Sequence, residues 1–323
     1  MKRQWVFLVS LCLCAALLLS CTAKTAPSAS ESGAESASSG EAQTVTFTDD
    51  LGREVTAPYQ PRSTAALIGS FASVWTLAGG ELTATADDAW TQFDLGLSED
   101  VVNLGQTTRV SLEKLFDVDP DFVIASVNTQ IDLDWKDTLE AAGIPVAYFD
   151  VNTFSEYLRM LDICTQVTGR RDLYTANGLD VQRQVDAAIA RANGEGPRVL
   201  YLRATAASVK AKSSRRNVLG EMLNDLGCVN IADEDSDLLE DLSLERIVQA
   251  DPDYIFVVKQ GADTASVEKN LNQLLLENPA WSGLAAVREE RVYYMDQKLY
   301  NLKPNNRWGE AYEQLADILF EKE

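Results

Sequence analysis

The sequence predicts an α/β protein of two similar lobes, each with a mainly parallel sheet flanked by helices. One observation is an internal repeat: residues 111–126 read SLEKLFDVDPDFVIAS, and residues 243–258 read SLERIVQADPDYIFVV, with six identical positions. The other is an alternation of apolar strand-like runs with helix-like segments along the chain. Copies that lie 132 residues apart are too widely spaced for a solenoid, so they indicate two lobes.

Each copy of the repeat predicts a helix followed by a buried strand. Ser111 and Ser243 can cap a helix, because a serine hydroxyl accepts hydrogen bonds from free backbone N–H groups at a helix start. Pro120 and Pro252 stop that helix about two turns later. The continuous apolar run after each proline is typical of a strand that is buried on both faces of a parallel sheet.

The remaining elements extend the alternation. A hairpin is expected over residues 45–57, around Asp50-Leu51-Gly52. Apolar runs predict strands at 65–69, 144–149, 198–203 and 291–295. Helices are expected at 281–287 and 308–320.

Two helical segments connect the lobes. Apolar residues recur at helical spacing through residues 154–168, and Gly169 ends that helix. Residues 172–192 predict a second helix of about 32 Å at 1.5 Å per residue. A helix of that length can cross from one lobe to the other as a single rod, which should limit lobe closure.

The first 43 residues are expected to lie outside the fold. Lys2 and Arg3 precede an uncharged apolar run over residues 5–20, which is typical of a secretory signal. The sequence Leu-Leu-Ser-Cys that ends at Cys21 resembles the lipobox of bacterial lipoproteins, where the cysteine is lipidated. Residues 22–43 are rich in Ser and Ala and lack large apolar residues, so they predict a disordered linker.

Composition excludes several classes of function. The 323 residues carry a formal net charge of −21 and contain no histidine. The acidity argues against a nucleic-acid partner, which needs a basic surface. Without histidine there is no Ser-His-Asp or Cys-His catalysis, and no metal site can use imidazole.

Two cysteines remain in the folded part. Cys164 and Cys228 lie in different sequence contexts, and two small buried apolar side chains are favoured over a disulfide.

From residue 44 to residue 323 the chain resembles the iron-complex type of ABC-transporter substrate-binding lipoproteins. The resemblance rests on DDLGREVTAP near the start, the two repeat copies, the helical connection and KPNNRWGEAYEQLADIL at the end. It implies two α/β lobes joined by one long helix, with the ligand in the cleft between them. The expected boundaries are 1–20 signal peptide, 21–43 lipidated cysteine and linker, 44–170 N-terminal lobe, 171–195 inter-lobe helix and 196–323 C-terminal lobe.

Ligand-binding candidates are sought just after predicted strands, because ligands of parallel sheets sit at the carboxyl ends of the strands. Arg203 ends an apolar strand, where a charge calls for an anionic partner. Lys210 and Lys212 belong to the densest basic cluster of the chain. The full set of expected ligand-binding residues is Trp75, Trp90, Arg109, Asn128, Arg203, Lys210, Lys212, Tyr300 and Lys303. For each of them a packing or solvent-facing role stays open.

The resemblance also implies partners. Glu113 and Glu245 match the family's glutamates, one per lobe, which dock onto arginines of the permease; compensation of the helix dipole is the alternative. The expected partners are a permease dimer with ATPase subunits and a small metal chelate, with membrane attachment only through the lipid. The protein is expected to be a monomer, outside the cytoplasm on the outer face of the membrane or in the periplasm.

The expected ligand class is mainly what the resemblance implies, and the missing histidines narrow it. They exclude the zinc and manganese binders of the same superfamily, so no metal is expected to be bound directly. A ferric siderophore is the first choice, a corrinoid the second and haem the third. No cofactor and no enzyme activity are expected. A surface enzyme or an adhesion lipoprotein on the same scaffold is the alternative from another class.

Overall fold

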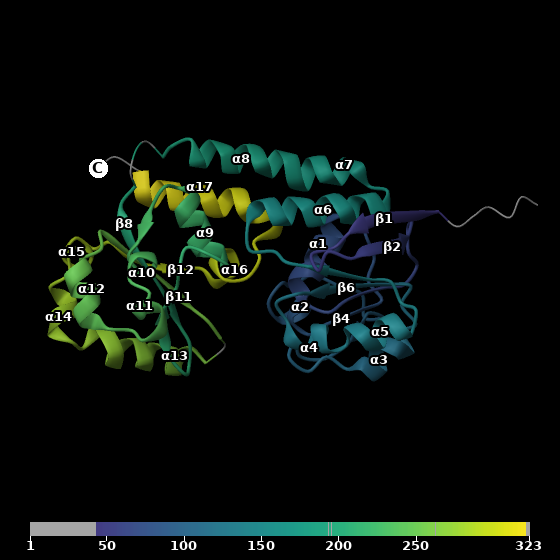
Figure 1. Cartoon of the computed structure of the whole chain (residues 1–323), viewed down its shortest axis with the longest axis horizontal. Helices are drawn as coiled ribbons and strands as arrows, with labels where there is room; N and C mark the ends of the chain where they lie inside the picture. Colours follow the sequence, from purple (N-terminus) through teal and green to yellow (C-terminus); the bar gives the residue numbers. More distant parts are fainter. Residues whose placement is uncertain (1–42, 193, 195, 262, 321–323) are drawn as a thin grey trace, which may run out of the picture. The chain divides into compact units, whose positions relative to one another are not determined.

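The computed structural model describes residues 43–320 apart from 193, 195 and 262. The predicted signal peptide, Cys21 and all but the last residue of the predicted linker lie outside these residues. Within the described part, two five-stranded sheets form the centres of two lobes (Figure 1). Both sheets are mainly parallel, as predicted.

The sheet of the N-terminal lobe is entirely parallel, with strand order β5-β4-β3-β6-β7. Its strands are β3 (Thr64–Ala66), β4 (Ala84–Thr85), β5 (Val102–Asn103), β6 (Phe122–Ser126) and β7 (Val146–Phe149). The helices of this lobe are α1 (Gly69–Leu77), α2 (Asp88–Thr91), α3 (Leu112–Asp117), α4 (Gln130–Asp134), α5 (Lys136–Ala141) and α6 (Phe154–Thr168). The predicted hairpin is the separate antiparallel pair β1 (Thr44–Thr48) and β2 (Glu54–Pro58).

The sheet of the C-terminal lobe has the order β10-β8-β11-β12, and β9 pairs antiparallel with β8. Its strands are β8 (Arg198–Ala204), β9 (Val209–Ala211), β10 (Val229–Asn230), β11 (Tyr254–Lys259) and β12 (Val292–Met295). The helices are α9 (Val218–Asp225), α10 (Ile231–Glu234), α11 (Asp237–Glu240), α12 (Leu244–Ala250), α13 (Thr264–Leu271), α14 (Pro279–Ser282), α15 (Ala285–Arg288), α16 (Gln297–Tyr300) and α17 (Trp308–Phe320). A π-helical turn, η2 (Asn272–Leu276), continues α13.

The two repeat copies fold alike. The Ser111 and Ser243 hydroxyls accept from the backbone N–H groups of Lys114 and Arg246, at 3.3 and 3.4 Å, so both predicted caps are confirmed. In both copies the aspartate before the proline has a left-handed backbone, with φ 44° at Asp119 and 39° at Asp251. The strands that follow, β6 and β11, pair with β3 and β8 in the middle of their sheets.

Three predicted elements need correction. The strand expected at 65–69 ends at Ala66, because α1 already begins at Gly69. The helix expected at 281–287 is two short helices, α14 and α15, which are interrupted at Gly283 and Leu284. The rod expected at 172–192 is present but ends earlier: it runs without a break from Arg171 to Ile189 as α7 (Arg171–Tyr174), a π-helical turn η1 (Thr175–Leu179) and α8 (Asp180–Ile189).

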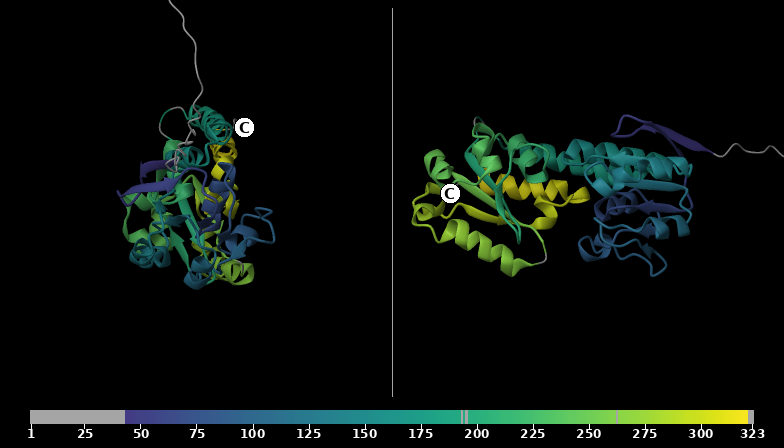
Figure 2. Two further views of the ribbon diagram at one scale, coloured as in Figure 1. Left: turned by 90° about the vertical axis from the view of Figure 1, so that its right-hand side faces the viewer. Right: turned by 60° about the horizontal axis from the view of Figure 1, so that its bottom comes forward.

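The inter-lobe connection is thicker than one helix. Figures 1 and 2 show α8 alongside α17, with α6 in the same layer. The ring of Trp308 at the start of α17 packs on Phe154 of α6, with 6.1 Å between centroids. One apolar cluster continues from Phe122 in the N-terminal sheet to Phe256 in the C-terminal sheet. The two lobes are therefore joined by a shared core as well as by the chain.

Candidate ligand-binding site

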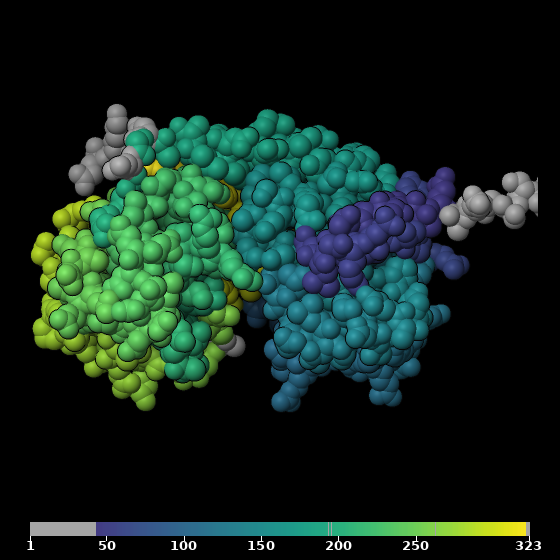
Figure 3. All heavy atoms as spheres, in the orientation of Figure 1, coloured from purple at the N-terminus to yellow at the C-terminus, as the bar shows by residue number. Residues whose placement is uncertain are grey.

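A cavity of about 450 Å³ lies between the two lobes, in the size range of small-molecule sites. The space-filling view shows the furrow between the lobes, on the side away from α8 (Figure 3). The N-terminal lobe lines it with Ile68, Ser70, Asp88, Phe93, Thr107, Ser126, Asn128, Thr129 and Asn152. The C-terminal lobe lines it with Arg203, Arg216, Asn217, Val218, Gln260, Asn301, Leu302 and Lys303.

Sheet topology explains why these residues converge. Each parallel strand of the N-terminal sheet is followed by lining residues near its carboxyl end, from Ser70 at the start of α1 after β3 to Asn152 after β7. In the other lobe Arg203 lies near the end of β8, and Gln260 follows β11. The carboxyl edges of the two sheets thus border one cavity, which is the expected place for a ligand of an open parallel sheet.

The N-terminal side of the cavity is mostly polar, and among its described lining residues Asp88 carries the one carboxyl group. The carboxylate of Asp88 accepts from the backbone N–H of Gly69 at 2.8 Å. A Cβ at Gly69 would lie 2.5 Å from the backbone nitrogen of Ala89, so only glycine allows α1 and α2 to approach this closely. Burial raises the pKa of Asp88 to about 6, and the charge of Asp87 adds to the rise.

A second carboxyl group lies buried next to a lining residue on the same side of the cavity. Asp132 is fully buried, and its Oδ2 accepts from the backbone N–H of Ser126, a lining residue, at 2.8 Å. Its Oδ1 has no hydrogen-bond partner in the described residues. Burial raises the pKa of Asp132 to about 7, and the nearby charge of Asp88 contributes. A buried group of this kind favours its protonated form near neutral pH.

The C-terminal side of the cavity is basic. Its lining includes Arg203, Arg216 and Lys303, and none of the three has a carboxylate ion-pair partner among the described residues. The loop that carries Arg216 is shaped by Asn217, whose amide donates to the carbonyls of Ser213 and Arg215 at 2.9 and 2.8 Å. Arg216 itself has a left-handed backbone with φ 60°.

Arg203 is the most constrained of these cations. Its Nε is buried without a partner, and one Nη lies 3.4 Å from the hydroxyl of Tyr201. Across the antiparallel pair β8–β9 it stands directly opposite Lys210, and like charges in such positions repel. Burial lowers the pKa of the neighbouring Lys212, and the charges of Arg203 and Lys210 lower it further. An anion beside Arg203 would offset the repulsion between Arg203 and Lys210. It would also favour the charged form of Lys212.

Lys303 reaches the cavity from a segment that touches both lobes. Its ammonium donates to Oδ1 of Asn152 at 3.4 Å. Two residues on, the amide of Asn305 donates to the carbonyl of Ser70 at 3.0 Å, which ties the segment to the N-terminal lobe. Burial lowers the pKa of Lys303 to about 8, although Asp150 and Glu156 oppose the shift.

The structure brings three of the nine predicted ligand-binding residues into the lining: Asn128, Arg203 and Lys303. Trp75 and Tyr300 do not line this cavity, because each is 1% exposed and packs in the core. The Trp75 Nε1 donates to the carbonyl of Glu81 at 2.8 Å, and the Tyr300 hydroxyl donates to that of Ala311 at 3.0 Å.

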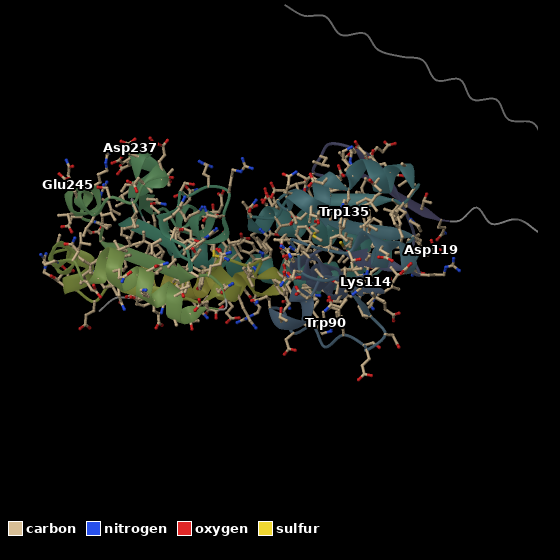
Figure 4. All side chains as sticks on the ribbon, turned by 90° about the horizontal axis from the view of Figure 1, so that it is seen from below. Trp90, Lys114, Asp119, Trp135, Asp237 and Glu245 are labelled. Carbon is tan, nitrogen blue, oxygen red and sulfur yellow. The ribbon has the colours of Figure 1, made fainter. Side chains whose placement is uncertain are left out.

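The other four candidates lie outside the lining as well. Trp90 is half-buried on α2 and packs against the core (Figure 4). Arg109 is exposed between β5 and α3, and Lys210 is exposed on β9. Lys212 is half-buried just after β9, behind Arg203.

Sequence reasoning missed Asp88 and Gln260, and it placed Arg216 in the basic cluster of Lys210 and Lys212 without selecting it as a ligand-binding residue. Asp88 and Arg216 belong to charged runs that are typical of solvated loops, so only the fold shows that they face a cavity. Gln260 follows the last residue of β11 directly, and the rule used for Arg203 would have found it.

Cys164 and Cys228 are free and buried, as predicted. Within residues 43–320 as described, no three His, Cys, Asp or Glu side chains gather in a way that could hold a metal ion. The helices of the same part of the chain include none that is long and apolar enough to cross a membrane.

Two α/β lobes with a cavity at the carboxyl edges of both sheets define a two-lobed solute-binding protein. Residues 65–299 match the family described as periplasmic binding protein, and the chain belongs to that family.

Individual relatives agree with this assignment. The iron-uptake system-binding protein of Bacillus subtilis (strain 168) is 24% identical over 195 residues, which are 58% of this chain and 59% of that protein. Staphylococcus aureus SirA complexed with staphyloferrin B has a similar fold, with TM-score 0.65, 20% identity and coverage of 85% of this chain and 96% of SirA. The siderophore-binding protein BauB, bound to ferric iron and two acinetobactin molecules, has TM-score 0.69 and 16% identity over 87% of this chain and 100% of BauB.

Proposed function

We propose that this protein is the substrate-binding lipoprotein of an ABC importer and captures an anionic ferric chelate, a siderophore in the first place. Membership of the periplasmic binding protein family supports capture of a solute. The relatives named for iron uptake and siderophore binding support an iron chelate.

The observation that carries the proposal is the basic side of the cavity. A protein with net charge −21 directs Arg203, Arg216 and Lys303 at one cavity without pairing any of them to a carboxylate of its described residues. Unpaired cations are stable there if the ligand brings the negative charge, since arginine binds carboxylates and catecholate-type oxygens through charge-assisted hydrogen bonds. The 450 Å³ of the cavity fits a complete chelate rather than a bare ion.

The test is a titration of the purified chain without its first 21 residues, followed by tryptophan fluorescence. The panel contains ferric citrate, ferric catecholate and ferric hydroxamate chelates, cobalamin and haem. We expect the anionic ferric chelates to bind best, and Arg203→Gln to weaken them. The matched control is Arg109→Gln, which removes an exposed cation outside the lining. If cobalamin or haem binds more tightly than the ferric chelates, the siderophore proposal is wrong and that ligand takes its place.

We propose that the chain binds its chelate without transforming it. Recovery of the intact chelate after incubation supports this, and turnover would favour the alternative of a surface enzyme on the same scaffold. A protein that bound no member of the panel but adhered to surfaces would instead be an adhesion lipoprotein.

Delivery and anchoring are parts of the same proposal. Lipid on Cys21 would tether the protein to the outer side of the membrane, and Cys21→Ala should release it into the medium. Glu113 and Glu245 are exposed on α3 and α12, and we propose that they dock onto the permease dimer. The variant Glu113→Ala plus Glu245→Ala should keep its ligand affinity and lose uptake. Normal uptake by that variant would contradict docking.

A further inference from the structure

Two large exposed apolar side chains occupy the same position in the two repeat copies. Phe116 on α3 is 40% exposed, and Val248 on α12 is 39% exposed. Both are the sixth residue of their copy, three residues after Glu113 and Glu245. Side chains three residues apart lie on the same face of a helix, so each glutamate has an exposed apolar neighbour one turn along.

These side chains have no part in the core. The residue just before each of them, Leu115 or Ile247, is fully buried and anchors its helix to the lobe. One residue further along a helix the side chain turns by about 100°, which carries Phe116 and Val248 out of the buried stripe. A single exposed apolar residue is ordinary, but two at equivalent places of a repeat indicate a shared use.

The two lobes also keep both glutamates unpaired in a similar way. Lys114 follows Glu113, and its ammonium donates to the backbone carbonyl of Asn103 at 2.8 Å. Arg246 follows Glu245, and its guanidinium is held by Asp235 and Asp237, both at 2.6 Å. The basic residue next to each glutamate is thus tied to its own lobe. The glutamates themselves are exposed and form no ion pair within the described residues.

The acidic run at residues 233–237 of the C-terminal lobe makes defined contacts, although its composition is typical of a solvated loop. Residues 233 and 234 end α10, residue 237 begins α11, and residues 235 and 236 lie between them. The carboxylate of Asp233 accepts from the backbone N–H of Ser214 at 3.1 Å. Asp235 and Asp237 then engage Arg246. Figure 4 labels Asp237 and Glu245 on this lobe, and Lys114 on the other lobe.

We propose that Glu113 with Phe116 and Glu245 with Val248 are matched docking patches, each made of one carboxylate and one apolar side chain. The occupant is the outer face of the permease dimer, with a cation and a shallow apolar depression on each half. Charge complementarity selects such a partner, because the free carboxylates of an acidic protein need a basic surface. The apolar side chains then bury area that the free protein leaves in water. This inference rests on the proposed delivery to a permease and adds the apolar half of the contact.

The test measures binding of the full lipidated chain to the permease–ATPase complex of the proposed importer, reconstituted in lipid nanodiscs. The apolar variant is Phe116→Ser plus Val248→Ser, and the charge variant is Glu113→Gln plus Glu245→Gln. The matched control is Leu274→Ser, which changes an apolar residue that is 52% exposed and lies on η2, outside both repeat copies. Each purified variant is first checked for unchanged affinity for the ferric chelate and an unchanged melting temperature.

We expect the apolar variant to bind the complex about 10-fold more weakly and the control to bind like the original chain. Salt separates the two halves of the contact, because it screens exposed charges but not apolar burial. At 0.5 M salt the loss of binding affinity caused by the charge variant should be smaller, by a factor on the order of several. The loss of binding affinity caused by the apolar variant should persist.

Two results would overturn the inference, and they differ in which part of the docking proposal remains supported. If the apolar variant binds fully and the charge variant does not, Phe116 and Val248 have no role in docking, and docking through the two glutamates remains supported. Full binding by both variants, or no binding by the original chain, removes docking through these helices altogether. Chelate affinity, measured separately, decides whether the proposed ligand class survives.

Discussion

The two lobes share a plan but face the cavity with different chemistry. Both place the strand of their repeat copy next to a central parallel strand, β6 beside β3 and β11 beside β8. The N-terminal lobe presents hydroxyls, amides and the carboxyl group of Asp88. The C-terminal lobe presents Arg203, Arg216 and Lys303. A duplicated fold thus supplies one side that can hydrogen-bond neutral parts of a ligand and another that can hold its negative charge.

The difference begins in the elements that the repeat does not share. Among the described residues an antiparallel strand joins only the C-terminal sheet, as β9, and the loop after β9 carries Arg216. The N-terminal sheet instead adds the parallel strand β5, and the segment after it contributes Thr107. Arg216 therefore comes from an addition to the common plan, whereas Arg203 lies on β8, a strand that belongs to the shared plan.

The largest expected effect comes from two glycines, one per lobe, that let helices approach the lining loops. A Cβ at Gly69 would lie 2.5 Å from the nitrogen of Ala89, and one at Gly220 would lie 2.3 Å from the carbonyl of Ser213. Because both contacts are with backbone, Gly69→Ala and Gly220→Ala should each lower the free energy of unfolding by about 3 kcal/mol. Urea unfolding measures this. Gly283→Ala, whose Cβ would meet only Ala280 at 3.3 Å, should change it by less than about 1 kcal/mol.

The next effect compares one ligand contact from each lobe. Arg203→Gln should weaken binding of an anionic ferric chelate about 30-fold, about 2 kcal/mol, because it removes a charged donor. Asn128→Ala should weaken it less than about 5-fold, since a neutral amide contributes about 1 kcal/mol or less. Fluorescence titration of both variants gives the ranking. The opposite ranking would mean that the N-terminal lobe supplies most of the affinity.

A third effect is the pH dependence of stability caused by Asp132. Its pKa is raised to about 7 in the folded protein, so the folded state binds more protons than the unfolded state between about pH 4 and pH 7. Stability from this group therefore falls as pH rises through that window. Asp132→Asn should be more stable than the original chain by about 1 kcal/mol at pH 8, and should lose that advantage at pH 4.5. Urea titrations at both pH values check this, and an equal difference at both would contradict it.

The smallest expected effect is a pH dependence of chelate affinity that is caused by Lys303 on the basic side of the cavity. Lys303 has a pKa lowered to about 8, so it loses its proton as pH rises through 8. An anionic chelate prefers the protonated form, and its affinity should fall a few-fold between pH 7 and pH 9. Lys303→Arg should abolish this decline, because arginine stays charged in that range. Lys210→Arg, outside the lining, should leave the decline in place.

Sequence alone predicted the architecture because its signals are local and occur twice. The caps at Ser111 and Ser243 and the apolar runs after Pro120 and Pro252 each fix a helix and a strand without reference to the rest of the chain. The π-helical turn η1 and the break at Gly283 were not predicted, because they depend on packing between helices rather than on periodicity.

The site was predicted less well than the fold. Position after a strand gave Asn128, Arg203 and Lys303, but it also gave Tyr300, whose side chain turns into the core. The side that a residue faces depends on how helices pack, and local sequence patterns do not show that packing. Asp88 shows the opposite case, since a carboxylate in an acidic loop becomes a lining residue only when α1 and α2 meet at Gly69.

The central claim is that the cations of the C-terminal lobe hold an anionic chelate between the lobes. The most direct measurement is the dissociation constant of two ferric chelates of similar size, one anionic and one neutral, for the original chain and for Arg203→Gln. We predict that the original chain binds the anionic chelate at least about 10-fold more tightly, and that Arg203→Gln removes most of this preference. Equal affinities for the two chelates, or a preference that survives Arg203→Gln unchanged, would contradict the claim.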